Sequence, residues 1–150
     1  MAQSLSSILI HLIFSTKHRE PLVTAQVEPA LHAYMAGILK EKQCPALTIG
    51  GMPDHVHVLF RLARTRAVSE VVEDLKKDSS RWIKTQGASF GAFHWQAGYG
   101  AFSIGQSSVA ETRRYIDNQK EHHQTRTFQE EYRVFLRKYG VEYDERYVWD

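Results

Sequence analysis

Hydrophobic residues follow two different periods along the chain, and each change of period marks the border of a predicted element. Ile8 to Phe14 is an almost continuous apolar run, which is typical of a strand buried on both faces. Between Thr24 and Lys42, apolar residues recur every three or four positions, which predicts a helix. The apolar stripe of this helix consists of Val27, Leu31, Tyr34, Met35, Ile38 and Leu39.

Two more strands and a second helix follow in the pattern. Ala46–Gly50 and His55–Leu62 are strand-like, and the turn-forming residues between them predict an antiparallel hairpin. Ala67–Gln86 has the helical period, and His94–Ile104 is a fourth strand-like segment with glycines inside it. The order strand, helix, strand, strand, helix, strand predicts an α+β fold of the ferredoxin-like (split βαβ) type, an antiparallel sheet with two helices on one face.

Two C-terminal helices complete the predicted fold, and a capping-box signature opens each of them. The first signature is Ser108–Glu111, which opens the helix that carries Tyr115. The second is Thr127–Glu130, which opens a last helix with the apolar side Phe128, Tyr132, Phe135, Leu136 and Tyr139. Since no repeat or linker divides the sequence, residues 1–150 are predicted to form one domain.

Composition changes this picture little. The 150 residues are 43% hydrophobic, which is enough for a normal core, and the net charge of +2 is too small to indicate nucleic-acid binding by itself. The run from Ile8 to Phe14 is too short for a membrane span and has no basic leader, so we expect a cytoplasmic protein that uses no membrane. Cys44, the only cysteine, is expected to be a small buried thiol.

His55 and His57 are the first candidates for chemistry. Because side chains alternate along a strand, both imidazoles point to one face. The opposite face then receives Val56, Val58, Phe60 and Leu62. Two imidazoles side by side on the open face of a sheet are a natural pair of ligands for a divalent metal. A pair of exposed surface histidines explains this short motif equally well.

Tyr115 and Gln119 are four residues apart, so they share one face of their predicted helix. Gln119 could give its carbonyl oxygen to a metal, while Tyr115 presents a phenol to whatever the metal binds. Alone, this pair is more simply the edge of an amphipathic helix. With the histidines it permits a mechanism, in which a metal polarises a phosphate and the tyrosine oxygen attacks phosphorus in line.

The remaining histidines and the basic residues carry weaker signals. His122 and His123 end the tyrosine helix, where cations that favour the helix dipole are a better interpretation than metal ligands. No partner spacing is found for His11, His18, His32 and His94. Candidate contacts to DNA phosphates, with solvated surface charge as the alternative, are Lys17, Arg19, Arg81, Lys84, Arg113 and Arg114.

Five segments, in the same order along the chain, resemble those of a known family. They are residues 11–19, 52–59, 80–84, 95–103 and 115–123. The family is that of the single-tyrosine HUH transposases, which includes the TnpA-type enzymes of IS two-hundred-like insertion sequences and the related REP-associated tyrosine transposases. Five ordered matches are far more specific than either chemical motif alone.

The resemblance implies a ferredoxin-like transposase catalytic domain and an obligate homodimer. It also implies cutting and rejoining of hairpin-bearing single-stranded DNA through a 5′-phosphotyrosine, with Mg²⁺ or Mn²⁺ as cofactor. Carried over by motif, Tyr115 is the nucleophile, and the metal ligands are His55, His57 and Gln119. In the family, the tyrosine helix of one subunit can complete the histidine site of the other.

Two alternatives to an active transposase stay open at this point. A domesticated REP-associated nuclease would need the same four residues, so the sequence cannot separate it from a transposase. A non-catalytic module for single-stranded nucleic acid would instead carry exposed aromatic residues on the sheet face where His55 and His57 stand.

Overall fold

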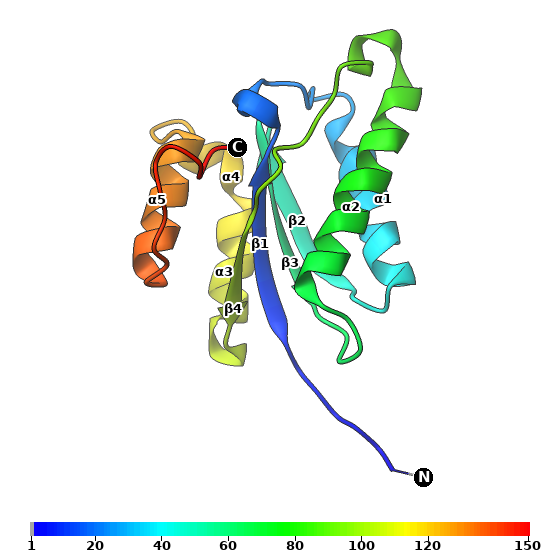
Figure 1. The fold of residues 1–150 in the computed structure, drawn as a ribbon, viewed down its shortest axis with the longest axis vertical. Helices are drawn as coiled ribbons and strands as arrows, with labels where there is room; N and C mark the ends of the chain where they lie inside the picture. Colours follow the sequence, from blue (N-terminus) through cyan, green and yellow to red (C-terminus); the bar gives the residue numbers. More distant parts are fainter. Residues whose placement is uncertain (1) are drawn as a thin grey trace.

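The structure is a computed structural model that describes residues 2–150. Four antiparallel strands form its centre. They are β1 (Leu9–Ser15), β2 (Ala46–Met52), β3 (His55–Arg61) and β4 (Gly100–Ile104), in the spatial order β2-β3-β1-β4 (Figure 1). This order, with a helix after β1 and another after β3, confirms the predicted ferredoxin-like α+β fold.

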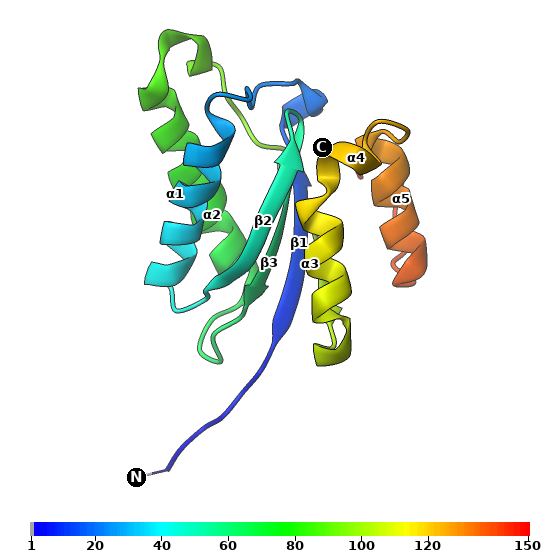
Figure 2. The ribbon, with the colours of Figure 1, turned by 180° about the vertical axis from the view of Figure 1, so that it is seen from behind.

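The helices lie in two layers, one on each side of the sheet, as Figure 2 shows from behind. One layer holds α1 (Glu28–Glu41) and α2 (Val68–Ile83). The other holds α3 (Val109–Asp117), α4 (Gln119–His122) and α5 (Phe128–Lys138). Single 3-10 turns occupy the connections: η1 (Lys17–Arg19), η2 (Lys84–Gln86), η3 (Ala88–Phe90) and η4 (Gln106–Ser108).

Alternation along β1 and β3 gives the sheet two unlike faces. The apolar face packs on α1 and α2 and consists of Ile10, Leu12, Phe14, Val56, Val58 and Phe60, all in the main core. The opposite face, which we call the histidine face, carries Leu9, His11, Ile13, Ser15, His55, His57 and Leu59. In the register, Ile13 pairs with His57 and His11 pairs with Leu59. The predicted division of β3 into a histidine side and an apolar side is confirmed.

Two glycines let the C-terminal helices approach the sheet closely. A Cβ on Gly50 of β2 would lie 2.2 Å from the backbone oxygen of Ile116 in α3. A Cβ on Gly100 of β4 would lie 2.7 Å from the hydroxyl of Tyr132 in α5. A larger side chain at Gly50 would push α3 away from the sheet, and one at Gly100 would displace the Tyr132 ring, so both glycines favour close cover of the histidine face.

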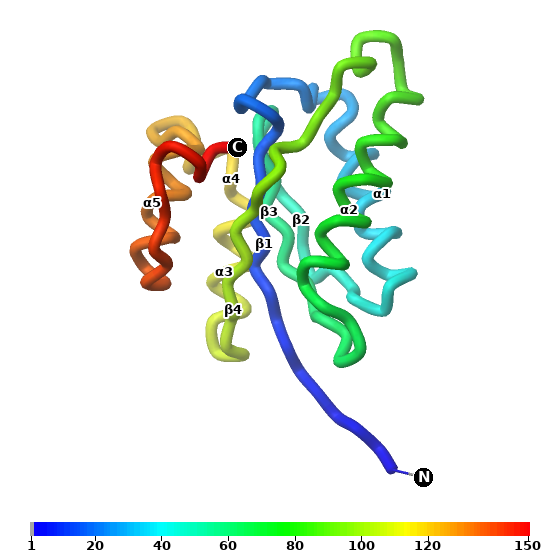
Figure 3. The backbone as a smooth tube through the Cα atoms, viewed as in Figure 1, coloured from blue at the N-terminus to red at the C-terminus, as the bar shows by residue number. Residues whose placement is uncertain are grey.

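The fourth strand is shorter than predicted, because β4 begins only at Gly100. The segment before it, which Figure 3 traces from α2 to the sheet, pairs with the chain after β1 at one isolated bridge, Thr16 with Trp95, and is also held by side chains. Gln96 Oε1 accepts a hydrogen bond from the Ser15 amide at 2.8 Å. Lys76 Nζ donates to the carbonyl oxygens of Gln96 and Gly98 at 2.9 and 2.6 Å. Lys76 thus ties this segment to α2 before the β4 ladder begins.

The predicted tyrosine helix is interrupted. α3 ends at Asp117, and Asn118, with φ −103° and ψ 26°, separates it from the short α4. α3 begins directly after Ser108, as the first capping signature predicts, but among residues 2–150 the Ser108 side chain caps no helix amide. The second is confirmed for its cap residue, since Thr127 Oγ1 accepts a hydrogen bond from the Glu130 amide at 3.2 Å.

Two smaller sequence expectations have different outcomes. Cys44 is fully buried, as predicted, and its sulfur accepts a hydrogen bond from the Ala63 amide at 3.3 Å. The helical period assigns Tyr34 to the apolar stripe of α1, but this side chain is 39% exposed and stacks on Trp82 of α2. An amphipathic ring can lie at the helix edge with one side in water, which the period alone does not reveal.

Candidate functional site

Both histidines of the His-x-His motif lie on β3 and point toward the C-terminal helices. Their side chains are buried, with 1% of His55 and 0% of His57 exposed. The expected open sheet face is therefore wrong, because α3, α4 and α5 cover it. The alternative of two exposed surface histidines is wrong for the same reason. A buried imidazole needs a partner for each polar nitrogen.

The Nδ1 atom of each histidine has a partner that orients the ring. His55 Nδ1 donates to the Asp54 carboxylate at 2.7 Å, and His57 Nδ1 shares a hydrogen bond of 2.9 Å with His11 Nε2. Both Nε2 atoms are consequently turned toward the helices. Histidines that bind metals characteristically have such a partner on their second nitrogen. His11 had no partner spacing in the sequence because 46 residues separate it from His57.

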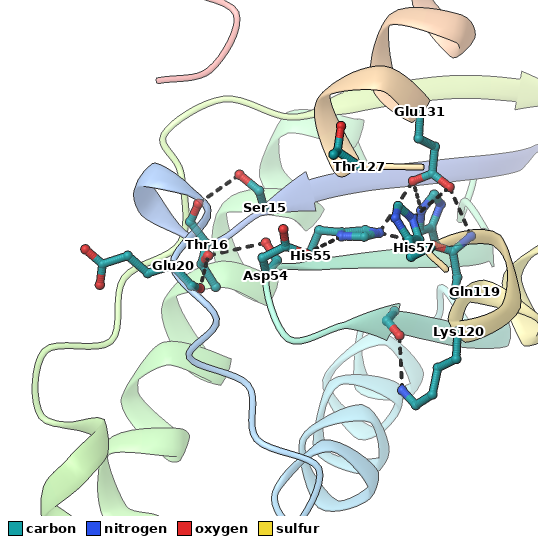
Figure 4. Close-up of polar contacts among 12 residues, drawn as sticks. Ser15, Thr16, Glu20, Asp54, His55, His57, Gln119, Lys120, Thr127 and Glu131 are labelled. Carbon is teal, nitrogen blue, oxygen red and sulfur yellow. Dashed lines mark hydrogen bonds and ion pairs between the residues drawn. The ribbon is translucent and has the colours of Figure 1, made fainter. Parts of the chain in front are cut away.

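Glu131 of α5 faces these two Nε2 atoms from above, as Figure 4 shows. Its Oε1 atom lies 2.8 Å from His57 Nε2 and 3.4 Å from His55 Nε2. Its side chain is fully buried. The sequence interpretation missed Glu131, although a carboxylate on the apolar side of the last helix, three residues after Phe128, was a visible signal.

Tyr115 and Gln119 reach the same carboxylate from α3 and α4. The Tyr115 hydroxyl donates to Glu131 Oε2, and Gln119 Nε2 donates to the same oxygen at 3.2 Å. Gln119 Oε1 lies 3.1 Å from His55 Nε2. The structure thus brings together, within one chain, all four residues of the two motifs, despite the break at Asn118.

His123, which follows α4, completes the cluster. Its Nε2 atom is buried and lies 3.2 Å from Glu131 Oε2. One ligand atom each of His55, His57, His123 and Glu131 lies within 4.8 Å of the others. Imidazole nitrogens and carboxylate oxygens are good ligands for several divalent metals, so the residues present fit a metal ion. The sequence interpretation of His123 as a helix-end cation did not predict that it lies in this cluster.

Burial and mutual charge set the protonation of the cluster. Burial lowers the pKa of His57, whereas at His55 the hydrogen bond to Asp54 and the Glu131 carboxylate outweigh burial and raise the pKa to about 9. Burial would raise the pKa of Glu131, but the surrounding imidazoles hold it well below its usual range. Burial and the Glu131 charge raise the pKa of Tyr115. The resting site therefore pairs a carboxylate with a protonated phenol.

Comparisons with known proteins place this geometry in a family. A family model described as IS200-like transposase matches residues 4–119. The chain belongs to the IS200-like transposase family. The ISDra2 transposase TnpA of Deinococcus radiodurans is 25% identical over 114 residues, which cover 73% of this chain and 81% of that protein. A transposase function follows from this membership.

Solved structures resemble the fold. A crystal structure assigned as a transposase from Deinococcus radiodurans is 23% identical, covers 79% of this chain and 98% of its own, and superimposes with a TM-score of 0.62. A REP-associated tyrosine transposase bound to a REP hairpin is 15% identical, covers 82% of this chain and 74% of its own, and gives a TM-score of 0.58.

The family match ends at Gln119, so it includes the sheet, both β3 histidines and Tyr115 but not α5. Glu131 and His123 accordingly come from a part of this IS200-like transposase that lies outside the matched segment. In the part of the chain that the structure describes, no helix is long and apolar enough to cross a membrane.

Two cavities border the cluster. One, of about 440 Å³, runs between α3 and α5 and is lined by Tyr115, Arg126 and Lys138. The other, of about 580 Å³, is lined by Arg19, Asp54 and again Arg126. Arg126, which the sequence interpretation did not single out, thus faces both cavities, and basic residues lie beside the tyrosine.

The candidate DNA contacts divide between the two sides of the sheet. Arg113 and Arg114 are exposed on α3, the helix of Tyr115, and Lys17 is exposed in η1 at the end of β1. Arg81 on α2 and Lys84 in η2 are also exposed, but they belong to the layer on the apolar face. Contact of these residues with DNA stays a prediction, and Arg19 lines a cavity that His123 also lines.

Proposed function

We propose that this transposase cleaves and rejoins single-stranded DNA, with Tyr115 as nucleophile and with a divalent metal held by His55, His57 and Gln119. The observation that carries the proposal is the convergence of the Tyr115 hydroxyl and the histidine Nε2 atoms on one buried carboxylate. A metal there supplies a Lewis acid that polarises a phosphate oxygen.

The chain's own residues account for the remaining parts of the reaction. Asp54 and His11 orient the two imidazoles, as their hydrogen bonds indicate. The Tyr115 oxygen forms a bond to phosphorus, and the bond from phosphorus to the 3′ oxygen breaks. The Glu131 carboxylate orients the phenol by accepting its hydrogen bond. The phenol proton leaves to solvent as the bond to phosphorus forms, and the 3′ oxygen takes a proton from solvent. The 5′-phosphotyrosine retains the diester's energy, so another 3′ hydroxyl can displace the tyrosine without ATP.

Hairpin-bearing single-stranded DNA is the substrate class that we propose. Its support is the similarity of the fold to a REP-associated tyrosine transposase bound to a REP hairpin, together with the basic residues around the tyrosine cavity. We also propose a homodimer, on the resemblance of the sequence alone. A hairpin in single-stranded DNA offers a folded duplex for recognition next to a flexible strand that can enter a cavity.

The test is the formation of a covalent protein–DNA adduct. Purified protein is incubated with end-labelled single-stranded hairpin DNA and Mn²⁺, and the products are separated under denaturing conditions. We expect a labelled adduct that is lost in Tyr115→Phe and in the presence of a chelator. Tyr139→Phe is the matched control, since Tyr139 lines the same cavity. An adduct of undiminished yield in Tyr115→Phe would show that the nucleophile is another residue.

A further inference from the structure

Glu131 presents its two oxygens to different groups. Oε1 faces the two β3 histidines, at 2.8 Å from His57 Nε2 and 3.4 Å from His55 Nε2. Oε2 accepts hydrogen bonds from the hydroxyl of Tyr115 and the side-chain amide of Gln119. A single buried carboxylate therefore stands between the proposed metal ligands and the proposed nucleophile.

His55 Nε2 faces two oxygen atoms, so something must lie between the nitrogen and these oxygens. The Asp54 carboxylate can only accept hydrogen bonds, so His55 Nδ1 must carry the proton of the hydrogen bond between them. In a neutral ring, the lone pair of His55 Nε2 then points at Glu131 Oε1 and at Gln119 Oε1, 3.4 and 3.1 Å away. Lone pairs of nitrogen and oxygen that meet in a buried site repel one another unless a proton or a metal ion lies between them.

We propose that Glu131 is a metal ligand through Oε1 and holds the Tyr115 hydroxyl through Oε2, so that α5 ties the nucleophile to the metal. This inference rests on the proposed function and deepens it, because it adds an anionic ligand from outside the family-matched segment. His123 Nε2, buried 3.2 Å from Glu131 Oε2, is a further nitrogen ligand atom in the same cluster.

The fold around α5 supports such a ligand. Phe128, Tyr132 and Leu136, on the same side of α5 as Glu131, pack against the histidine face with Ile13 and Phe102. Their burial places the carboxylate at a fixed depth, which a loop residue could not provide. A ligand on α5 has a direct consequence, because metal binding then stabilises the docked position of the whole helix.

Calorimetric titration with Mn²⁺ alone tests the assignment. We expect Glu131→Gln, which keeps the size of the side chain, to bind Mn²⁺ at least about ten-fold more weakly than the wild type. Glu130→Gln on the same helix is the matched control, since Glu130 is exposed, and we expect wild-type affinity there. Equal or tighter Mn²⁺ binding by Glu131→Gln would mean that the carboxylate only fills the site, and it would overturn the inference.

Hydrogen exchange of the α5 amides gives a second readout that needs no DNA. In the wild type, Mn²⁺ should slow exchange across Phe128–Lys138, and in Glu131→Gln it should not. If Glu131→Gln does not fold, the wild-type experiment decides, since α5 exchange that is unchanged by bound Mn²⁺ overturns the inference. Failure of the wild type to bind Mn²⁺ at all would instead refute the proposed function.

Discussion

The two faces of β3 bury different kinds of side chain, apolar residues on one face and polar histidines on the other. On the apolar face, Val56, Val58 and Phe60 pack against α1 and α2 in an ordinary core. On the histidine face, His55 and His57 are just as deeply buried, but each imidazole nitrogen there faces another polar atom. Burial on the apolar face is favourable for each residue by itself. Burial on the histidine face is tolerated only because His11, Asp54 and residues of α4 and α5 supply polar partners.

We therefore expect the apolar face to determine stability and the histidine face to determine function. A defect on the apolar face should cost folding free energy and leave the chemistry alone. A defect on the histidine face should remove metal binding and catalysis, since its groups act together. Substitutions on neighbouring residues of one strand can therefore separate the two roles.

The largest effect is expected for His57→Ala. Removing this imidazole takes away one proposed metal ligand, so we expect Mn²⁺ affinity and adduct yield to fall by more than about 100-fold. The measurements are calorimetry with Mn²⁺ and the adduct assay. Wild-type Mn²⁺ affinity in His57→Ala would contradict the ligand assignment, because the histidine face would then be as unimportant for metal binding as the apolar face.

Mixing two inactive variants tests whether Tyr115 acts with the histidines of its own chain. The Tyr115 ring lies 5.8 Å from the His57 ring of the same chain. This proximity predicts that Tyr115→Phe mixed with His57→Ala forms no more adduct than either variant alone. Restored adduct in the mixture would instead show that the tyrosine helix of one subunit serves the histidines of another, as the sequence resemblance implied.

A smaller effect is expected at His11, which positions His57 without facing Glu131. His11→Leu removes the acceptor for His57 Nδ1, so Mn²⁺ affinity should fall by about 10- to 100-fold. His11→Gln offers an oxygen acceptor in its place and should recover part of the loss. If the Leu and Gln variants lose equal affinity while both remain folded, the hydrogen bond does not orient the ligand.

The smallest effect on chemistry is expected on the apolar face. Val58→Ala removes two methyl groups from the main core and should lower the free energy of unfolding by about 2 kcal/mol. The Mn²⁺ affinity of the folded protein should stay at the wild-type value. Urea unfolding and Mn²⁺ calorimetry measure the two quantities, and a matching loss of metal affinity would show that the faces are coupled.

The apolar face could be predicted from the sequence and most of the histidine face could not. Alternation in β3 is a local signal, so it places Val58 and His57 on opposite sides without knowledge of the fold. His11 gave no such signal, because it stands inside an apolar run and its partner lies on another strand. The period of the last helix places Glu131 on its apolar side, but the groups that this carboxylate meets come from β3, α3 and α4, which no local period encodes.

A covalent, metal-dependent link between Tyr115 and DNA is the feature on which the proposed function depends. Mass spectrometry of the peptides from a nuclease-trimmed, proteolysed adduct tests it directly. We predict one modified peptide, carrying a 5′-phosphorylated nucleotide on Tyr115, which forms only when Mn²⁺ or Mg²⁺ is present. A nucleotide on any other residue, or an equal yield of the Tyr115 adduct with chelator present, would contradict the account.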